Sequence, residues 1–363
     1  MKKKSAKYSV SYSNDGKELL KVDENYQGEF VVPEGVVSIG EEAFMGCEGI
    51  TSVVLPESVV FIRDRAFCDC FSLSSINLPS SLLEIGDNAF EFCYIETINL
   101  PESLTYIGTE AFKFGSLKEV VLPKSLTTIS SGCFLACLYL KSVVMPESVL
   151  YIENGAFLGC KELTSIEIPC SVVSIAHTAF VGCDKLTSLK VDPDNSIYDS
   201  REDCNAIIET ATNTLVTASG RTQIPQTVTR IGTYAFSNSR GTVFVPKQIT
   251  SIATKAFDSS LLNELHFESD CPSEIEFGED AIPANISVIV PPDTAPIYSF
   301  HKAFSHRGLR IVAEELPEPE WDWEAELKKM MSEPKCIDWE VYEWELEDDI
   351  SEGDEMWGKL FLS

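Results

Sequence analysis

Residues 50–70 read ITSVVLPESVVFIRDRAFCDC, and this stretch returns along the chain with small changes. Its phenylalanine recurs at intervals of 21 to 23 residues, broken once, at Phe44, Phe67, Phe90, Phe112, Phe134, Phe157, Phe180, Phe236 and Phe257. A proline stands eleven residues before each of the nine phenylalanines, and an isoleucine stands five residues before each. Three positions that recur together nine times indicate one repeated structural unit.

Such a unit cannot bury its own apolar side, so the repeat predicts stacking. Parallel coils set about 5 Å apart place like residues over like residues and build a continuous core. Each unit shows two short extended segments, such as 50–55 and 58–62, with the proline between them, where its missing N–H does least harm. The recurring phenylalanines should therefore form one buried column.

The unit resembles the BspA-like leucine-rich repeat, with the signature L-x-x-V-x-L-P-x-S-V-x-x-I-G-x-x-A-F-x-x-C, over about residues 30 to 267. The resemblance implies a mostly β fold, a right-handed leucine-rich-repeat solenoid of about nine repeats of 21 to 23 residues. It also implies a binding or adhesion protein, often at a cell surface. Departures are small-for-small replacements, with Cys133 for the alanine and Gly115, Ser239 and Ser260 for the cysteine.

Four regions follow from this pattern. Residues 1–32 hold a hairpin signal around Asn14-Asp15-Gly16 and are expected to cap the first coil. The solenoid spans 33–267, with a hairpin-rich insertion at 193–224 where the phenylalanine spacing grows. Residues 268–313 lose the period and are interpreted as a closing cap. Residues 314–363 form an acidic, tryptophan-rich tail with 18 acidic and 4 basic residues.

Composition excludes several classes of partner. The formal net charge of −29 makes a surface that repels phosphate backbones and anionic lipid, so nucleic-acid binding is not expected. No apolar run reaches the roughly 20 residues of a membrane-spanning helix. The basic start, Met1 to Tyr8, lacks the apolar segment of a secretory signal, so either the chain is not exported by that route or its true start lies upstream.

The sequence offers little chemistry. Six of its 12 cysteines stand three residues after the phenylalanine, and we interpret this ladder as reduced and structural. No cysteine pair has the spacing of a zinc site, and residues 192–203 lack the glycine of a calcium loop, so no metal or cofactor is expected. The four histidines pair with no nucleophile by spacing, and His301 and His306 are expected on the solvated surface of the cap. We predict no catalytic residues and no enzyme.

Candidate binding residues are those that do not recur. The slot before each recurring isoleucine should point outward and carries Phe61, Tyr106 and Tyr151 on alternate coils. Exposed aromatics are favoured anchors at interfaces, although single exposed apolar residues are also ordinary surface. A competing face is the exposed slot one residue before the apolar position that flanks the proline, occupied by Val54, Asn77, Asn99, Val121, Val144, Glu167 and Lys190.

All five tryptophans lie in the tail, at Trp321, Trp323, Trp339, Trp344 and Trp357. Residues 323–331 place apolar side chains on one face of a predicted helix between Pro319 and Pro334. This segment either docks on a partner, folds back on the last coil or remains disordered.

The sequence therefore predicts a non-enzymatic protein-binding module that resembles bacterial surface and adhesion proteins. The alternative is an intracellular scaffold or inhibitor whose acidic, tryptophan-rich tail captures a basic partner. The missing signal segment favours a cytoplasmic chain, and the family resemblance favours a cell-surface or secreted one. The sequence names neither the protein partner nor the oligomeric state.

Overall fold

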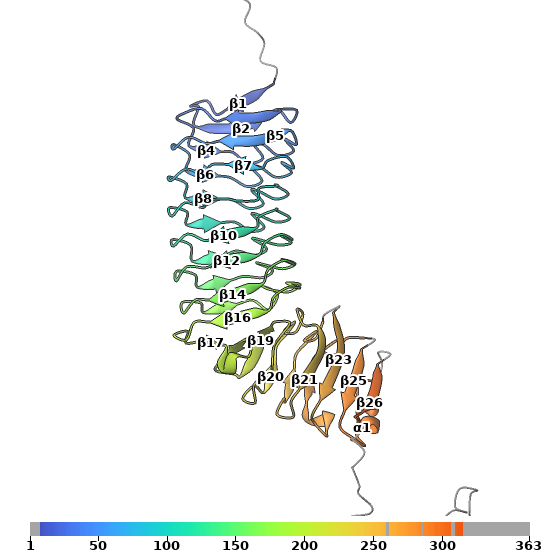
Figure 1. The fold of residues 1–363 in the computed structure, drawn as a ribbon. Helices are drawn as coiled ribbons and strands as arrows, with labels where there is room; N and C mark the ends of the chain where they lie inside the picture. The colour runs from blue at the N-terminus through green and yellow to red at the C-terminus, as the bar shows by residue number, and fades with distance from the viewer. Residues whose placement is uncertain (1–7, 259–260, 285, 306–308, 315–363) are drawn as a thin grey trace, which may run out of the picture. The chain divides into compact units, whose positions relative to one another are not determined.

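The computed structural model describes residues 8–314, except 259–260, 285 and 306–308. Within these ranges the chain is mostly β and winds into coils that stack on one another (Figure 1). Each typical coil contributes a two-residue strand to a first ladder and a second strand to another ladder, and like strands of neighbouring coils pair in parallel within several short sheets that make up each ladder. The prediction of a stacked solenoid is confirmed.

The first ladder is built from the dipeptide that ends in the recurring isoleucine. Register is kept from coil to coil, since Ile39 pairs with Ile62 and Ile62 with Ile85. All of these isoleucines are buried. The strands of the first ladder are β4 (Ser38–Ile39), β6 (Phe61–Ile62), β8 (Glu84–Ile85), β9 (Tyr106–Ile107), β11 (Thr128–Ile129), β13 (Tyr151–Ile152), β15 (Ser174–Ile175), β20 (Arg230–Ile231), β22 (Ser251–Ile252) and β24 (Glu276–Phe277).

The second ladder precedes the prolines and alternates buried with exposed side chains, as in the pattern of Ser165–Ile168. This alternation is typical of a sheet with one face in the core. Its strands are β3 (Gly28–Val31), β5 (Ile50–Val54), β7 (Ser75–Ile76), β10 (Glu119–Val121), β12 (Ser142–Val144), β14 (Ser165–Ile168), β16 (Ser188–Val191), β21 (Gly241–Val245), β23 (Leu262–Phe267), β25 (Ser287–Val290) and β26 (Arg310–Ala313).

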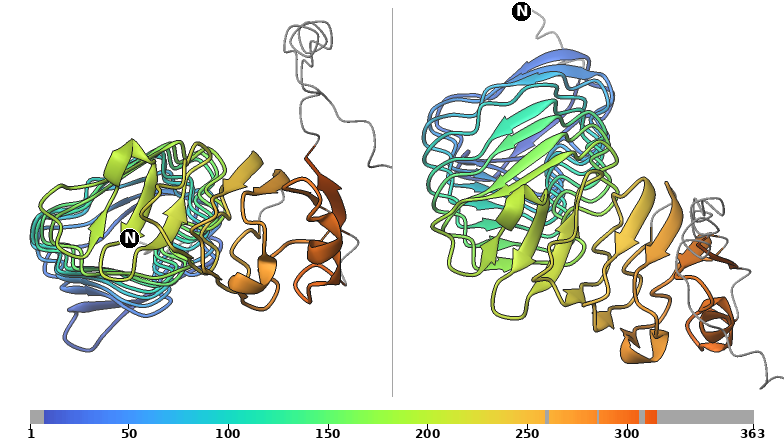
Figure 2. Two further views of the ribbon diagram at one scale, coloured as in Figure 1. Left: turned by 90° about the horizontal axis from the view of Figure 1, so that it is seen from below. Right: turned by 60° about the horizontal axis from the view of Figure 1, so that its bottom comes forward.

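Seven of the nine phenylalanines form one buried column on the loop side of the coils, whereas Phe236 and Phe257 form a separate stacked pair in the core that follows the insertion. From Phe44 to Phe180, successive rings are stacked with centroids 4.8 to 5.6 Å apart. Backbone bonds also tie these loops together, since the amide of Phe67 donates to the carbonyl of Ala89 in the next coil at 2.8 Å. The loops are therefore part of the ordered stack, and Figure 2 shows their outlines overlaid in the view along the coils.

The serine two residues after the proline has a defined bond. In each case its hydroxyl donates to a backbone carbonyl of the preceding coil, as Ser58 does to Val36 at 2.7 Å and Ser125 to Leu104 at 2.6 Å. Because a buried carbonyl without a partner is costly, this recurring residue stabilises the six junctions between coils at which it occurs, from Ser58 to Ser171.

Two antiparallel elements interrupt the parallel pairing. At the start, β1 (Val10–Tyr12) and β2 (Glu18–Val22) form a hairpin, and β2 pairs in parallel with β4. The insertion holds β17 (Tyr198–Asp199), a 3-10 turn η1 (Arg201–Asp203), β18 (Ala206–Glu209) and β19 (Thr214–Ala218). In β18, Ile207 packs into the core of the preceding coils and Ile208 into the core of the following ones. The inserted hairpin thus supplies apolar side chains to both cores.

The parallel pairing of strands continues past residue 267, into the segment that is interpreted from the sequence as a closing cap. Phe277 of β24 pairs with Ile252 in the place of an isoleucine, and Ile282 is buried after Ala281 as the phenylalanines are after their alanines. In this coil the phenylalanine and the isoleucine have exchanged positions. The exchange keeps the core filled, but it hides the period of the repeat in the sequence. The segment also contains η2 (Pro272–Glu274) and the helix α1 (Ala295–Phe300). In the part of the chain that the structure describes, no helix is long and apolar enough to cross a membrane.

Candidate interaction surfaces

The first ladder places Phe61, Tyr106 and Tyr151 in outward register positions. Phe61 and Tyr106 each pair with Glu84, which separates them, and Tyr151 lies between Thr128 and Ser174. Tyr106 and Tyr151 are each 46% exposed, whereas Phe61 is half-buried with the Arg63 guanidinium 4.3 Å from its ring centroid. The three aromatics share one column but do not form a continuous patch.

The competing face on the second ladder is interrupted as well. Val121 and Val144 are adjacent and strongly exposed, at 64% and 56%. The side chain of Asn77 is engaged within the fold, because it accepts a hydrogen bond from the Leu55 amide and donates one to the Leu55 carbonyl. This face therefore offers two separate pairs of exposed valines, Val121 with Val144 and Val31 with Val54, rather than one strip.

A third surface, which the sequence analysis missed, lies on the loop side of the stack. It is an open hollow of about 720 Å³, named here the aromatic groove. Tyr94 and Tyr139 are 52% and 56% exposed at this surface. The groove is lined by Phe92, Tyr94, Glu96, Phe114, Gly115, Ser116, Lys118, Ala136, Leu138 and Tyr139.

The groove arises where two successive coils are one residue short. The buried apolar residue that follows the cysteine comes three residues later in most coils, as from Cys137 to Leu140. It comes only two residues later at Ile95, after Cys93, and at Leu117, after Gly115. Because these two loops are shorter than the next one, which carries Leu138 and Tyr139, a recess is left beside it.

The two phenylalanines of the groove adopt a conformation that suits glycine. Phe92 and Phe114 have φ values of 57° and 56°, and every coil from Phe44 to Phe180 has a positive φ at this position, where the other residues are Gly46, Asp69, Ala136, Gly159 and Gly182. An L-residue in this left-handed region costs about 1–2 kcal/mol. Their rings stack on each other with centroids 4.6 Å apart, on the outside of the coil rather than in the core. Because two stacked rings outside the core border an open hollow, we treat the groove as the candidate site.

Ion pairs fix the charges around the groove. Lys113 Nζ lies 2.6 Å from Glu110 and 3.2 Å from Glu91, and these hydrogen bonds, that with Glu110 first, raise the pKa of Lys113. Lys118 Nζ lies 2.6 Å from Glu96, and both of these side chains remain substantially exposed. An exposed pair such as that of Lys118 with Glu96 contributes only about 0–1 kcal/mol to stability, so little free energy is needed to separate its two side chains.

A signal for the groove was present in the sequence. The spacing of 22 residues from Phe90 to Phe112 and again from Phe112 to Phe134 marks the shortened coils. In the same coils, phenylalanine occupies the slot two residues after the recurring phenylalanine, where glycine, alanine or aspartate stands elsewhere between Phe44 and Phe180. The short spacing and the phenylalanine at this slot occur in the same two coils. Neither departure indicates a site without the other.

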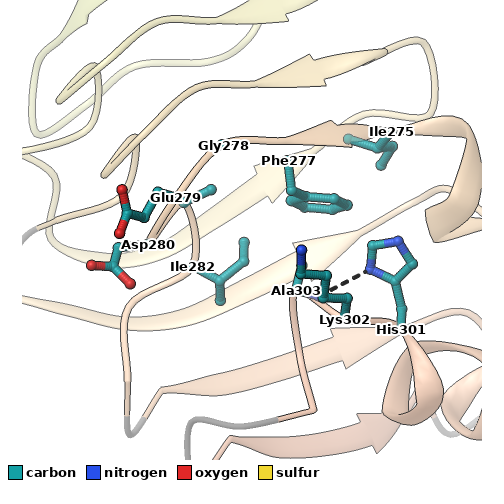
Figure 3. Close-up of a pocket in the computed structure, with 10 residues that line it drawn as sticks. Ile275, Phe277, Gly278, Glu279, Asp280, Ile282, His301, Lys302 and Ala303 are labelled. Carbon is teal, nitrogen blue, oxygen red and sulfur yellow. Dashed lines mark hydrogen bonds between the residues drawn. The ribbon is translucent and has the colours of Figure 1, made fainter.

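A second hollow, of about 490 Å³, lies in the segment that follows residue 267 (Figure 3). Glu279 and Asp280 lie at one end, and His301 and Lys302 lie at the other. His301 was expected on the solvated surface, but its ring is partly buried 5.3 Å from that of Phe277, and this burial lowers its pKa. Its Nδ1 accepts a hydrogen bond from the Ala303 amide, so the neutral ring carries its proton on Nε2.

The cysteine ladder and the acidic segment 192–203 have structural roles within the stack. Each ladder thiol is buried, and the eleven described cysteines are free. Asp192 accepts the amide of Asp194 in a turn, and Asn195 donates to carbonyls of the preceding coil. Among described residues, no group of three or more histidine, cysteine, aspartate or glutamate side chains is placed to hold a metal ion. His306 and the five predicted tryptophan sites, Trp321, Trp323, Trp339, Trp344 and Trp357, lie outside the described residues.

Parallel ladders on two sides of each coil and a buried phenylalanine column on the third define a leucine-rich-repeat protein. The sequence profile of the BspA type leucine-rich repeat region matches residues 25–141, 127–208 and 216–279, in six copies. The chain belongs to the BspA-type leucine-rich repeat family. Among curated proteins, none matches the chain.

Two solved bacterial structures share the fold. A leucine-rich cell surface protein from Faecalibacterium prausnitzii is 24% identical, with a TM-score of 0.62, and the alignment covers 87% of this chain and 96% of that one. A leucine-rich repeat protein from Bacteroides ovatus is 22% identical, with a TM-score of 0.55, over 85% of this chain and 76% of that one.

Proposed function

We propose that this protein is a non-enzymatic protein-binding module whose main contact surface is the aromatic groove. The observation that carries the proposal is the placement of Phe92 and Phe114, whose rings stack on each other outside the core and line an open hollow. A rigid stack that presents clustered aromatic side chains loses little entropy on binding, and aromatic residues in pockets are frequent hot spots of interfaces.

The lining of the two hollows supports a binding role over a catalytic one. The aromatic groove has no histidine among its lining residues, and the hollow beside His301 is lined by no hydroxyl or thiol side chain. Neither of these two hollows therefore joins a hydroxyl or thiol to an imidazole base, which is the arrangement of serine and cysteine acyl-transfer enzymes.

A pull-down with variants of the full chain tests the binding surface. Phe92→Gly/Phe114→Gly, the groove variant, removes both rings and places glycine where other coils have it. We expect it to lose the partner and to keep its far-UV circular dichroism spectrum. Tyr106→Ser/Tyr151→Ser serves as the matched control for the first ladder. Loss of the partner in the control, with retention in the groove variant, would move the interface to the first ladder.

The proposal places the protein at the bacterial surface, as the name of the Faecalibacterium relative indicates for that protein. Protease added to intact cells tests this location. A surface protein should be cut under conditions that leave a cytoplasmic marker intact, whereas a chain cut only after lysis is not an adhesin.

The acidic tail favours a second candidate function, an intracellular scaffold or inhibitor that captures a basic partner. Residues 314–363 have a net charge of −14 and contain all five tryptophans. A chain that ends at residue 313 separates the two candidates in the same pull-down. Loss of the partner from the shortened chain would assign recognition to the tail, and retention would assign it to the solenoid.

A further inference from the structure

The aromatic groove has an apolar floor and one exchangeable charge pair. Glu96 and Lys118 are the charged side chains among its lining residues, and they neutralise each other at 2.6 Å. The side chain of Glu96 is 61% exposed, so it can bond a different cation without losing contact with water. The remaining lining consists of aromatic rings, Leu138, Ala136 and two small residues.

Two aromatic rings of this protein already contact cationic side chains. The Arg63 guanidinium lies 4.3 Å from the ring centroid of Phe61, and Lys113 Nζ lies 5.5 Å from that of Phe114. Such contacts arise because the face of an aromatic ring is electronegative, and arginine makes them more often than lysine because its planar group also stacks. Tyr94 and Tyr139 present further exposed rings around the same groove.

The net negative charge of the whole chain also favours a positively charged partner. With a formal net charge of −29, the protein attracts positively charged partners and repels acidic ones over the first nanometre of approach. Electrostatic complementarity of this kind sets which partners arrive, and the apolar lining then determines which of them stay.

We propose that the aromatic groove binds an arginine-bearing, positively charged segment of a partner protein. The proposal rests on the protein-binding function above and specifies the chemistry of its partner. An arginine side chain packs against the exposed ring of Tyr139 and takes Glu96 from Lys118, while neighbouring apolar side chains of the segment cover Leu138 and Phe114.

Fluorescence anisotropy with labelled synthetic peptides tests this partner chemistry on the full chain. The probe is a peptide of alternating arginine and leucine, and its two counterparts carry lysine or glutamate in place of arginine. We expect the arginine peptide to bind most tightly, the lysine peptide less tightly and the glutamate peptide not at all. The groove variant should weaken binding of the arginine peptide by about tenfold. Attraction to the acidic tail is common to all variants and cancels in this comparison.

Two lysine substitutions separate a site from general charge attraction. Lys118→Ala frees Glu96 and should tighten binding of the arginine peptide by about threefold, roughly the worth of one exposed ion pair. Lys185→Ala is the matched control, because Lys185 also lies 2.6 Å from a glutamate, Glu162, but does not line the groove. Both variants change the net charge equally, so the control should bind the peptide like the wild type.

Three results would overturn the proposal. These are equal binding of the arginine peptide to the wild type and the groove variant, binding of the glutamate peptide at comparable strength, and equal effects of Lys118→Ala and Lys185→Ala. If the groove variant also loses its partner in the pull-down, the protein-binding function stands and only the cationic chemistry is wrong. If it keeps that partner, the binding surface itself is misplaced.

Discussion

At the scale of the residue, the recurring cysteine has a bonding role as well as a packing one. Cys93 Sγ donates to the carbonyl of Phe67 at 3.1 Å, and Cys160 Sγ does the same to Phe134 at 3.1 Å. The Phe134 carbonyl also accepts the amide of Cys137 in its own coil. The thiol therefore satisfies a second lone pair across the junction between coils, which explains why a small side chain with a weak donor recurs there.

Replacement of a ladder cysteine should cost more stability than replacement of an exposed one. Cys160→Ala removes a buried thiol and its hydrogen bond, and we expect a loss of about 1–2 kcal/mol in the free energy of unfolding. Cys170→Ala is the control, because Cys170 is exposed, and its effect should be close to zero. Urea unfolding under reducing conditions measures both. Equal losses would show that the ladder bonds contribute nothing.

The phenylalanine column should be the most sensitive feature of the fold. Phe134 is fully buried between the rings of Phe112 and Phe157. We expect Phe134→Ala to lower the free energy of unfolding by about 3–5 kcal/mol. Phe300→Ala changes the same side chain at a position that is 88% exposed and should have little effect. Chemical denaturation of the two variants checks the contrast, and similar midpoints would contradict a packed column.

At the scale of the element, the N-terminal hairpin covers one end of the stack. Strand β2 pairs with β4, so the first complete coil has no open ladder edge on that side. An uncovered edge would present unpaired backbone groups to a second chain. Adjacent residues of β2 distinguish its two faces, because Leu19 is fully buried and Leu20 is 42% exposed.

This strand provides a matched pair of substitutions. Leu19→Ala leaves a cavity beneath the hairpin, and we expect a loss of about 2–4 kcal/mol together with self-association as the first coil is uncovered. Leu20→Ala should change neither property. Chemical denaturation and light scattering measure the two effects. A variant Leu19→Ala that stays monomeric and as stable as Leu20→Ala would show that the hairpin does not protect the edge.

At the scale of the whole molecule, stability should fall in alkaline solution. Burial raises the pKa of Cys47 to about 11 and that of Cys137 and Cys183 to about 12, from an ordinary value of 9.0. Above pH 9 the unfolded chain releases these protons while the folded chain retains them. Each such thiol then removes about 1.4 kcal/mol of stability per pH unit until its folded pKa is reached.

We therefore expect the free energy of unfolding to be flat between pH 7 and pH 8 and to fall steeply above about pH 9. Guanidinium unfolding at a series of pH values, with reductant present, measures this profile. The variant Cys160→Ala lacks one buried thiol and should show a shallower slope. A stability that stays constant to pH 11 would mean that the thiols are not buried in the folded protein.

The recurrence in the sequence predicts the scaffold because every coil meets the same requirement. An apolar residue at the position of Phe90 or Ile107 must face its copies above and below, so the same residue type is needed at each step. The sequence predicts a coil less well where the residue type at a recurring position changes. Phe277 and Ile282 fill the positions of isoleucine and phenylalanine with equal success, and the exchange conceals a coil from a search for the period.

The candidate site was not predictable by the same reasoning. Tyr106 and Tyr151 follow from register alone, since an outward slot remains outward in every coil. The aromatic groove instead depends on the path of three successive loops, because a missing residue creates a recess only if the neighbouring loop does not fill it. Leu138 and Tyr139 border the recess from a coil of ordinary length, and no local pattern announces that arrangement.

The sequence by itself determined the stacked architecture, the buried columns and the acidic charge of this protein, because each is a property repeated or summed along the chain. Only the tertiary structure decided which of the variable side chains meet. Phe92, Phe114 and Tyr139 are separated by more than twenty residues in each case, and they line one surface because the coils place each loop beside the next. Contacts between coils are set by loop length and backbone conformation, which act in three dimensions and leave only faint marks on the period.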